Sequence, residues 1–220
     1  MRKIVMAFDV DGTLIDSVGP HLEAVNYLLK VFKVSPLTLE ELRDRYKDCR
    51  KFYKELGIEA EFSELNKHYW PVFSSIVEVV SPPLFAGAKE VLFFLKHNVA
   101  QVVLLTSQKQ ETVDFYHSYT GLLDLAHESH ILTSGQHKYD KLKEIKERGA
   151  SLDEANENIY IFVSDTPDDL VDGQEAGWLV YGVPTGFSSA DNLRAVIRPG
   201  QGAVLPDLFE LKKMFCQGFN

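Results

Sequence analysis

The sequence predicts an α/β protein in which a doubly wound parallel sheet carries an inserted α-helical cap. Two observations predict this fold class. Short runs that are apolar on both faces alternate with helical patterns, as in βαβ units whose sheet is covered by helices. The alternation is interrupted once, between residues 18 and 80, where the periodic segments have helical spacing. The 220 residues suffice for one core and a smaller inserted unit.

Five runs are predicted to be strands, because each is a short apolar run of the kind that a parallel sheet buries. They cover residues 4–8, 99–106, 130–132, 158–163 and 178–183. Helical patterns lie between the later runs, at residues 87–97, 109–120, 138–149 and 167–176. Strands and helices that alternate at this length indicate parallel connections throughout the sheet.

The interruption predicts three consecutive helices with no strand between them. Their patterns cover residues 21–32, 39–56 and 63–80. Pro71 is expected to end or kink the third helix, because proline removes a backbone donor and clashes with the preceding turn. Ser81-Pro82-Pro83 then forms a natural semi-rigid hinge. We therefore expect a discontinuous core, residues 1–17 and 81–220, and a helical cap, residues 18–80.

Composition and charge exclude several classes of protein. With 45% hydrophobic and 25% charged residues, the chain has the composition of a globular domain. Its net charge of −9 and its scattered Lys and Arg residues argue against a nucleic-acid polymer as partner. No run approaches the roughly 20 apolar residues that cross a bilayer, so no membrane is expected.

The location is expected to be the cytoplasm. Cys49 and Cys216 have no second thiol or histidine at metal-ligand spacing, so neither a zinc knuckle nor a disulfide framework is indicated. The apolar run at the amino terminus is broken by Asp9, too early for the apolar region of a signal peptide. Both observations fit a reducing compartment.

Polar side chains follow several of the predicted strands at the point where each strand ends. They are Asp9 and Asp11 after the first strand, Thr106 and Ser107 at the second, and Ser164 and Asp165 after the fourth, while Lys138 opens the helix after the third. In open α/β sheets the active groups gather at the carboxyl ends of the strands. We therefore expect these side chains to meet in one crevice.

The paired aspartates indicate phosphoryl chemistry. Asp9 and Asp11 lie two positions apart, so their side chains lean the same way while the chain is extended. Such a pair favours a cation between the charges, and the oxygen ligands of Asp9 and Asp165 suit Mg²⁺, which uses one or two carboxylates plus phosphate. Lys138 and Thr106 would hold the phosphoryl oxygens. One carboxylate can then attack phosphorus while its neighbour handles protons.

These residues resemble the four motifs of the haloacid dehalogenase superfamily. The first motif, DxDGT, is matched by Asp9-Val10-Asp11-Gly12-Thr13. The second, third and fourth motifs are matched by Thr106, by Lys138, and by Asp165 with Asp169. The resemblance covers the whole chain and implies a Rossmann-like core whose insertion is the family's type-one helical cap. The branch it points to is that of the phosphoglycolate phosphatases and β-phosphoglucomutases.

The resemblance also implies a role for each matched residue. Asp9 would be the nucleophile that forms a phosphoaspartate, and Asp11 would protonate the leaving oxygen and then activate water. Gly12 and Thr13 would shape the phosphate-binding loop, to which Ser107 adds a backbone N–H. Asp9, the carbonyl of Asp11 and Asp165 would bind Mg²⁺, with Asp169 supporting that shell.

Several alternatives stay open at the level of single residues. Lys141 lies one turn after Lys138 and is a rival for the motif lysine. Ser164 stands where the family often has Gly or an acid, so the metal shell would rely more on Asp169. Asp169 is also a candidate for a capping box with Thr166, ahead of Pro167 at the first helical position. His21 is expected to face solvent.

The function that the sequence favours is a Mg²⁺-dependent phosphatase acting on a small phosphorylated metabolite. The main rival is a sugar phosphomutase, which uses the same core residues. A non-catalytic ligand-binding relative is a weaker rival, because no core group is missing. Dehalogenase chemistry is weaker too, because attack on carbon needs neither Asp11 nor magnesium. The sequence leaves the substrate and the oligomeric state open.

Overall fold

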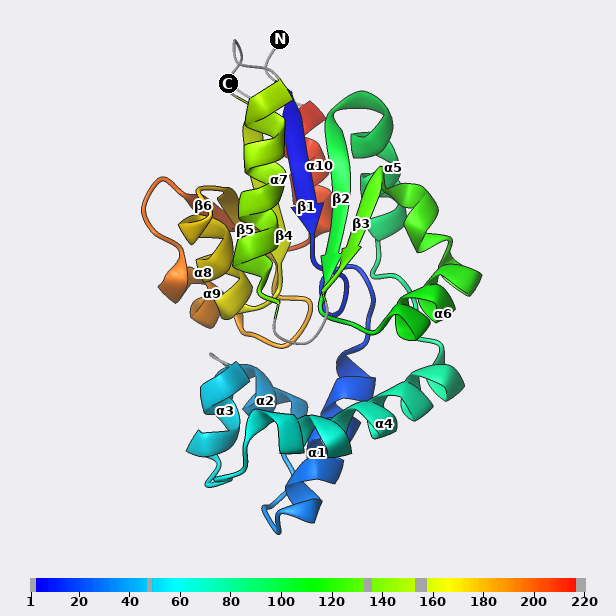
Figure 1. Ribbon diagram of the computed structural model, residues 1–220, viewed down its shortest axis with the longest axis vertical. Helices are drawn as coiled ribbons and strands as arrows, with labels where there is room; N and C mark the ends of the chain where they lie inside the picture. The colour runs from blue at the N-terminus through cyan, green and yellow to red at the C-terminus, as the bar shows by residue number, and fades with distance from the viewer. Residues whose placement is uncertain (1–2, 47–48, 133–135, 153–157, 217–220) are drawn as a thin grey trace.

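The computed structural model describes residues 3–46, 49–132, 136–152 and 158–216. Its centre is a six-stranded sheet in the order β3-β2-β1-β4-β5-β6, in which every neighbouring pair is parallel (Figure 1). The strands are β1 (Ile4–Phe8), β2 (Ala100–Thr106), β3 (Glu128–Ile131), β4 (Ile159–Ser164), β5 (Leu179–Gly182) and β6 (Gly202–Val204). The predicted doubly wound parallel sheet is confirmed.

Helices cover both faces of the sheet. One face packs on α5 (Ala88–Asn98), α6 (Gln110–Thr120), the short 3-10 helix η1 (Leu122–Leu125) and α10 (Leu208–Cys216). The other face packs on α7 (Lys138–Leu152), α8 (Pro167–Glu175) and α9 (Ala190–Val196). Alternate residues of β1 enter the two layers, because successive side chains of a strand point to opposite faces. Met6 and Phe8 belong to one apolar cluster, and Val5 and Ala7 to the other.

Among the described residues between β1 and α5 there are four helices, which lie beyond the carboxyl ends of the strands (Figure 1). They are α1 (Val18–Val31), α2 (Leu39–Arg45), α3 (Cys49–Glu55) and α4 (Phe62–Val80). They share a third apolar cluster, in which Leu28, Leu42 and Phe52 are almost fully buried and to which Phe187, after β5, also belongs. This third cluster agrees with a separate cap, although the division at residues 17/18 and 80/81 stays a prediction.

One expectation for this region was wrong. The single helical pattern at residues 39–56 forms two helices, because Tyr46 leaves the helical conformation at ψ 87° and its carbonyl accepts a hydrogen bond from Ser188 Oγ at 2.8 Å. Of the two outcomes expected at Pro71, an end or a kink of the helix, the end is excluded, since α4 continues to Val80. Proline cannot donate the backbone hydrogen bond of a helix, and packing offsets this loss. Phe73 and Val77, just after the proline, are buried in the apolar cluster on the α5 and α10 face of the sheet.

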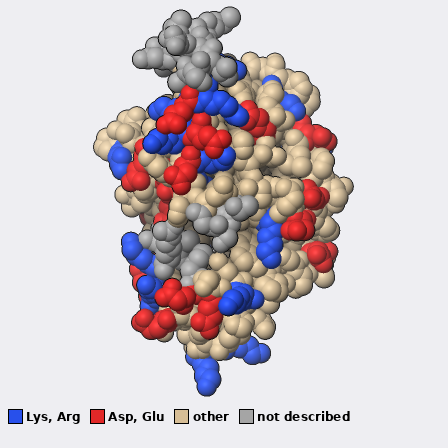
Figure 2. Space-filling model, viewed as in Figure 1, with Lys and Arg blue, Asp and Glu red and all other residues tan. Residues whose placement is uncertain are grey.

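The carboxyl-terminal quarter adds elements that the sequence patterns did not predict. These are β6, α9 and α10. Earlier in the chain, β3 covers Glu128–Ile131, where a strand at residues 130–132 was expected. None of the described helices is long and apolar enough to cross a bilayer. On the face drawn in Figure 2, the Lys and Arg side chains are interspersed with Asp and Glu, which is the scattered charge expected from the sequence.

Candidate active site

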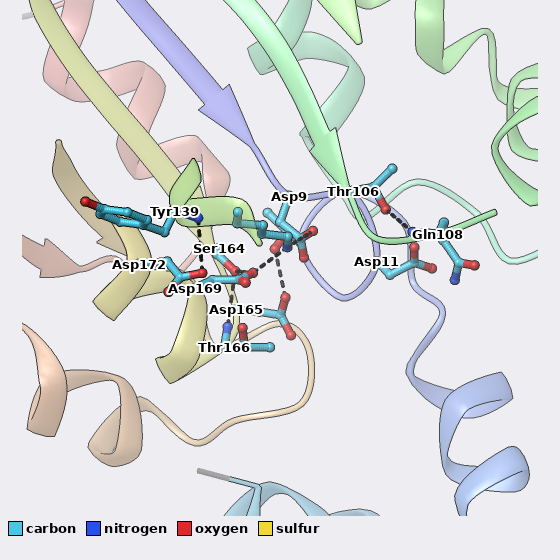
Figure 3. Close-up of polar contacts among 12 residues, drawn as sticks. Asp9, Asp11, Thr106, Gln108, Tyr139, Ser164, Asp165, Thr166, Asp169 and Asp172 are labelled. Carbon is cyan, nitrogen blue, oxygen red and sulfur yellow. Dashed lines mark hydrogen bonds and ion pairs between the residues drawn. The ribbon is translucent and has the colours of Figure 1, made fainter. Parts of the chain in front are cut away.

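The chain reverses its winding direction between β1 and β4, and this switch point carries the polar residues. Phe8 pairs with Val163 at the ends of the two strands, and the Asp9 amide donates to the Val163 carbonyl at 3.0 Å. Asp9 and Asp165 therefore leave neighbouring strands side by side, as Figure 3 shows. Ligands of open α/β sheets bind in the crevice at such a switch point.

The loop after β1 turns tightly around the Asp165 carboxylate. Gly12 has φ +78°, and a Cβ there would lie 2.4 Å from Asp165 Oδ2, so only glycine fits this approach. Gly186 approaches the same carboxylate from the opposite loop. Thr13 Oγ1 donates to Asp165 Oδ1 at 2.9 Å, and the Phe187 amide donates to Oδ2 at 2.8 Å. The position of Asp165 is thus defined from both sides.

Lys138 links the acidic residues of two strands. It opens α7, is buried, and its Nζ lies 2.5 Å from Asp9 Oδ1 and 2.6 Å from Asp169 Oδ2. Burial opposes its charge, but the carboxylates of Asp169 and Asp9 outweigh burial and raise its pKa. Lys141 instead pairs with the largely exposed Glu144. Of the two candidate lysines, the structure brings Lys138 to the aspartates.

Asp169 faces the site. The Ser164 hydroxyl donates to Asp169 Oδ2 at 2.6 Å, and Lys138 binds the same oxygen. Thr166 and Pro167 do stand at the N-cap and the first position of α8, but the Thr166 side chain makes no capping hydrogen bond. The capping box considered from the sequence is therefore not formed. Asp172, one turn further along α8, instead accepts from the Tyr139 amide at 3.2 Å, next to Lys138.

The acidic cluster, formed by Asp9, Asp165 and Asp169, carries more negative charge than Lys138 neutralises. Burial raises the pKa of Asp9, and the charges of Asp169 and Asp165 raise it further. The positive charge of Lys138 lowers the pKa of Asp9 and offsets this increase only in part. Burial likewise raises the pKa of Asp165 to about 7, despite its hydrogen bonds from Phe187 and Thr13. A cation among these carboxylates would relieve this cost.

The donor set fits Mg²⁺ on this chemistry. Among the described ranges, no three His, Cys, Asp or Glu side chains form a ready-made metal cluster. Mg²⁺ does not need one, because it usually binds one or two carboxylates and completes its octahedron with waters and substrate phosphate. Asp9 and Asp165 supply two adjacent carboxylates of this kind.

Asp11 lies on the other side of Asp9, near Thr106 and Gln108 (Figure 3). Its Oδ1 accepts a hydrogen bond from Tyr116 at 2.7 Å and faces His21 Nε2 at 3.8 Å. Burial favours the neutral acid, but the interactions with His21 and Tyr116 outweigh burial and lower the pKa of Asp11.

The end of β2 supplies a hydroxyl beside this acid. Thr106 is buried, and its Oγ1 accepts a hydrogen bond from the backbone N–H of Gln108 at 3.1 Å. Ser107 is exposed at the strand end. The structure thus places each predicted residue at the carboxyl edge of the sheet, on two sides of Asp9.

Three residues at this edge were missed or misjudged from the sequence. His21 does not face solvent, because its ring packs against Phe73 at 4.0 Å and Phe187 at 4.6 Å between centroids. Tyr116 and Gln108 were not considered, although both are buried. A signal for Tyr116 exists, since a tyrosine on the apolar stripe of a helix needs a partner for its hydroxyl.

Through Arg43, helix α2 contacts the loop that holds Asp165. Arg43 donates from Nε to the Gly186 carbonyl at 2.9 Å and from Nη2 to the Thr185 carbonyl at 3.1 Å. Thr185 in turn donates from Oγ1 to the Gly12 carbonyl at 2.6 Å. Helix α2, the loop that holds Asp165, and the loop after β1 are therefore connected by hydrogen bonds.

A known protein family matches most of the chain. The family model of haloacid dehalogenase-like hydrolases matches residues 6–183. The comparison with curated proteins gives no match.

Solved structures share the fold over almost the whole chain. A predicted phosphatase from Clostridium acetobutylicum has a TM-score of 0.73 at 17% identity, covering 99% of this chain and 100% of its own. A candidate phosphoglycolate phosphatase from Lactobacillus delbrueckii has a TM-score of 0.72 at 14% identity, covering 97% and 98%. A candidate β-phosphoglucomutase from Thermotoga maritima has a TM-score of 0.62 at 17% identity, covering 98% and 99%.

Proposed function

The chain belongs to the haloacid dehalogenase-like hydrolases, and on that premise we propose that it is a Mg²⁺-dependent phosphatase of a small phosphorylated metabolite. One observation carries the proposal. The buried Asp9 carboxylate is bound by Lys138, whereas the carboxyl group of Asp11 is bound by Tyr116. Two carboxylates in different environments suit two different roles.

In the first step, an Asp9 carboxylate oxygen attacks phosphorus. A new bond forms between that oxygen and phosphorus, and the bond from phosphorus to the leaving oxygen breaks. The leaving oxygen keeps the electron pair and takes a proton from Asp11, which yields an alcohol and a phosphoaspartate. Asp11 favours its charged form in the free protein, and the negative phosphoryl group beside it would favour the protonated acid once substrate is bound.

In the second step, Asp11 acts as a base. A water oxygen attacks the phosphorus of the phosphoaspartate and gives a proton to Asp11. The bond between phosphorus and the Asp9 oxygen breaks, and its electron pair returns to the Asp9 carboxylate. Inorganic phosphate leaves, and both aspartates regain their starting state.

The other site residues would bind the phosphoryl group and the metal. Lys138 and Thr106 would bind the phosphoryl oxygens, with the Gly12-Thr13 loop and the Ser107 amide beside them. Asp9, the Asp11 carbonyl and Asp165 would hold Mg²⁺, and Asp169 would support Lys138. The bound Mg²⁺ would neutralise negative charge on the phosphoryl group.

A small substrate follows from the cap. Arg43 brings α2 onto the loop at Thr185 and Gly186, next to Asp165. A cap in this position would exclude bulk water during the reaction and limit the size of the leaving group.

The cytoplasm remains the proposed location, and Cys216 is a free, exposed thiol.

The test is release of inorganic phosphate from a panel containing phosphoglycolate, sugar phosphates, nucleotides and p-nitrophenyl phosphate. Each compound is assayed with Mg²⁺ and with chelator, on the wild type and on Asp9→Asn. We expect release that requires Mg²⁺ and is abolished by the substitution. A folded wild type that releases phosphate from none of them would contradict the proposal. Isomer analysis with a sugar bisphosphate activator would then test the phosphomutase alternative.

A further inference from the structure

The two carboxyl oxygens of Asp11 have different surroundings. Oδ1 accepts the Tyr116 hydroxyl at 2.7 Å and faces His21 Nε2. Oδ2 is buried and has no hydrogen-bond partner among the described residues. The Ser17 hydroxyl lies close enough to favour the charged form of Asp11, but it makes no hydrogen bond of ordinary geometry. A buried polar atom without a protein partner is uncommon, and a role in catalysis is one of the reasons for which such an atom is retained.

Tyr116 is built to hold Oδ1. Its ring is completely buried on α6, in the apolar cluster that includes Leu122 and Leu104. Burial and the neighbouring Asp11 charge raise the pKa of Tyr116 far above its ordinary value, so its hydroxyl remains a donor. The ring cannot turn away without leaving the core, which makes the hydroxyl a fixed point.

His21 cannot hold Asp11 in the same way. Its Nε2 is 3.8 Å from Oδ1, which is beyond hydrogen-bond distance. Its Nδ1 contacts the Tyr69 hydroxyl of α4, so the ring is attached to the cap. Tyr116, by contrast, belongs to the same unit as Thr106, because α6 follows β2 in the chain.

We propose that Tyr116 is a positioning residue that fixes the Asp11 carboxyl group, so that Oδ2 is the oxygen that exchanges protons with the leaving group and with water. The inference rests on the proposed phosphatase function and assigns the proton transfers in it to one atom. Oδ2 gives its proton to the leaving oxygen as the bond to phosphorus breaks. It then takes a proton from the water that attacks the phosphoaspartate.

The test compares two leaving groups. Protonation matters for an alkyl phosphate, whose leaving alkoxide is a strong base, and matters little for p-nitrophenyl phosphate, whose leaving phenolate is stable. The quantity compared is kcat/KM, because it reports the steps from free enzyme and substrate up to the first phosphoryl transfer, the one to Asp9. We expect Tyr116→Phe to lower kcat/KM about tenfold or more for the alkyl phosphate. For p-nitrophenyl phosphate we expect a loss of less than about twofold.

Tyr119→Phe is the matched control, because Tyr119 lies on the same helix and its hydroxyl donates to the Pro82 carbonyl at 2.8 Å. It should leave both values of kcat/KM unchanged. Melting temperatures establish that each variant is folded. In the double variant with Asp11→Asn, the Tyr116→Phe substitution should have no further effect on the alkyl phosphate, since it acts through Asp11.

Three outcomes would overturn the inference. Equal losses with both substrates would mean that Tyr116 only supports the fold, as would additive effects in the double variant. Wild-type rates in Tyr116→Phe would mean that Asp11 needs no fixed partner. A wild type that hydrolyses neither substrate would instead refute the phosphatase function itself, and the inference would fail with it.

Discussion

Lys138 Nζ bridges Asp9 Oδ1 and Asp169 Oδ2, at 2.5 Å and 2.6 Å. The lysine thereby joins the first and fourth motifs, which come from neighbouring strands. One positive charge stands against three buried or nearly buried carboxylates, the third being Asp165. This relationship makes Lys138 important both for the stability of the fold and for the proposed chemistry.

Lys138→Met is expected to impair both. Removing one partner of a buried ion pair leaves uncompensated charge and costs about 3–5 kcal/mol of unfolding free energy. Loss of a donor to the phosphoryl oxygens lowers kcat by about a hundredfold or more. Urea unfolding and phosphate release measure the two effects. The control is Lys141→Met, where a surface pair with Glu144 contributes only about 0–1 kcal/mol. Similar results for the two variants would contradict this account.

Gly12→Ala is expected to destabilise the protein and reduce phosphate release. Alanine is strained at φ +78°, and its Cβ would overlap Asp165 Oδ2. We expect a loss of about 1–3 kcal/mol, seen as a lower melting temperature. Gly19→Ala is the control, since no atom lies within 4 Å of its added Cβ and helix α1 tolerates alanine. A melting temperature that is unchanged in Gly12→Ala would refute the geometry of the loop.

Stability without divalent cations should fall as pH rises. Burial raises the pKa of Asp165 to about 7 in the folded protein, against about 3.9 in an unfolded chain. Between these values the folded state holds a proton that the unfolded state has lost, so the unfolding free energy decreases from about pH 4 to about pH 7. Urea unfolding in chelator measures this slope. Asp165→Asn should have a flatter slope than the wild type, and equal slopes would contradict the assignment.

Mg²⁺ should restore the stability that is lost at high pH. A ligand that binds only the folded state at 100 times its Kd adds about 2.7 kcal/mol. The gain should be larger at pH 8 than at pH 5, because the proton and the cation compete for Asp165 and Asp9. Thermal unfolding of the wild type and Asp165→Asn, with and without Mg²⁺, measures it. A gain that is the same in both proteins would place the cation elsewhere.

Arg43→Met should weaken the contact between helix α2 of the proposed cap and the loop at Thr185 and Gly186. Its guanidinium donates two hydrogen bonds to the carbonyls of Thr185 and Gly186. Their loss is expected to raise KM about tenfold, with a smaller effect on kcat, because closure over the substrate becomes less favourable. Steady-state kinetics on the best substrate of the panel measures the change. Arg45→Met, an exposed neighbour on α2, is the control, and an equal KM in the two variants would argue against this role.

The sheet and the positions of the motif residues were predictable because they depend on local pattern. A run such as Ile4–Phe8 is apolar on both faces, which is typical of a parallel strand covered by helices on both sides. Parallel strands end at one edge, so Asp9, Thr106 and Asp165 were bound to approach one another. The strand β6 was missed because Gly202–Val204 is too short to produce a periodic signal.

The sequence by itself determined the fold class, the types of residue at the strand ends and the order of the four motifs, since each depends on residues a few positions apart. Only the tertiary structure decided that Lys138 rather than Lys141 reaches Asp9, that His21 turns inward, and that Tyr116 holds Asp11. Tyr116 and Asp11 lie 105 positions apart in the chain. Such contacts depend on how helices pack on the sheet, and no local spacing encodes them.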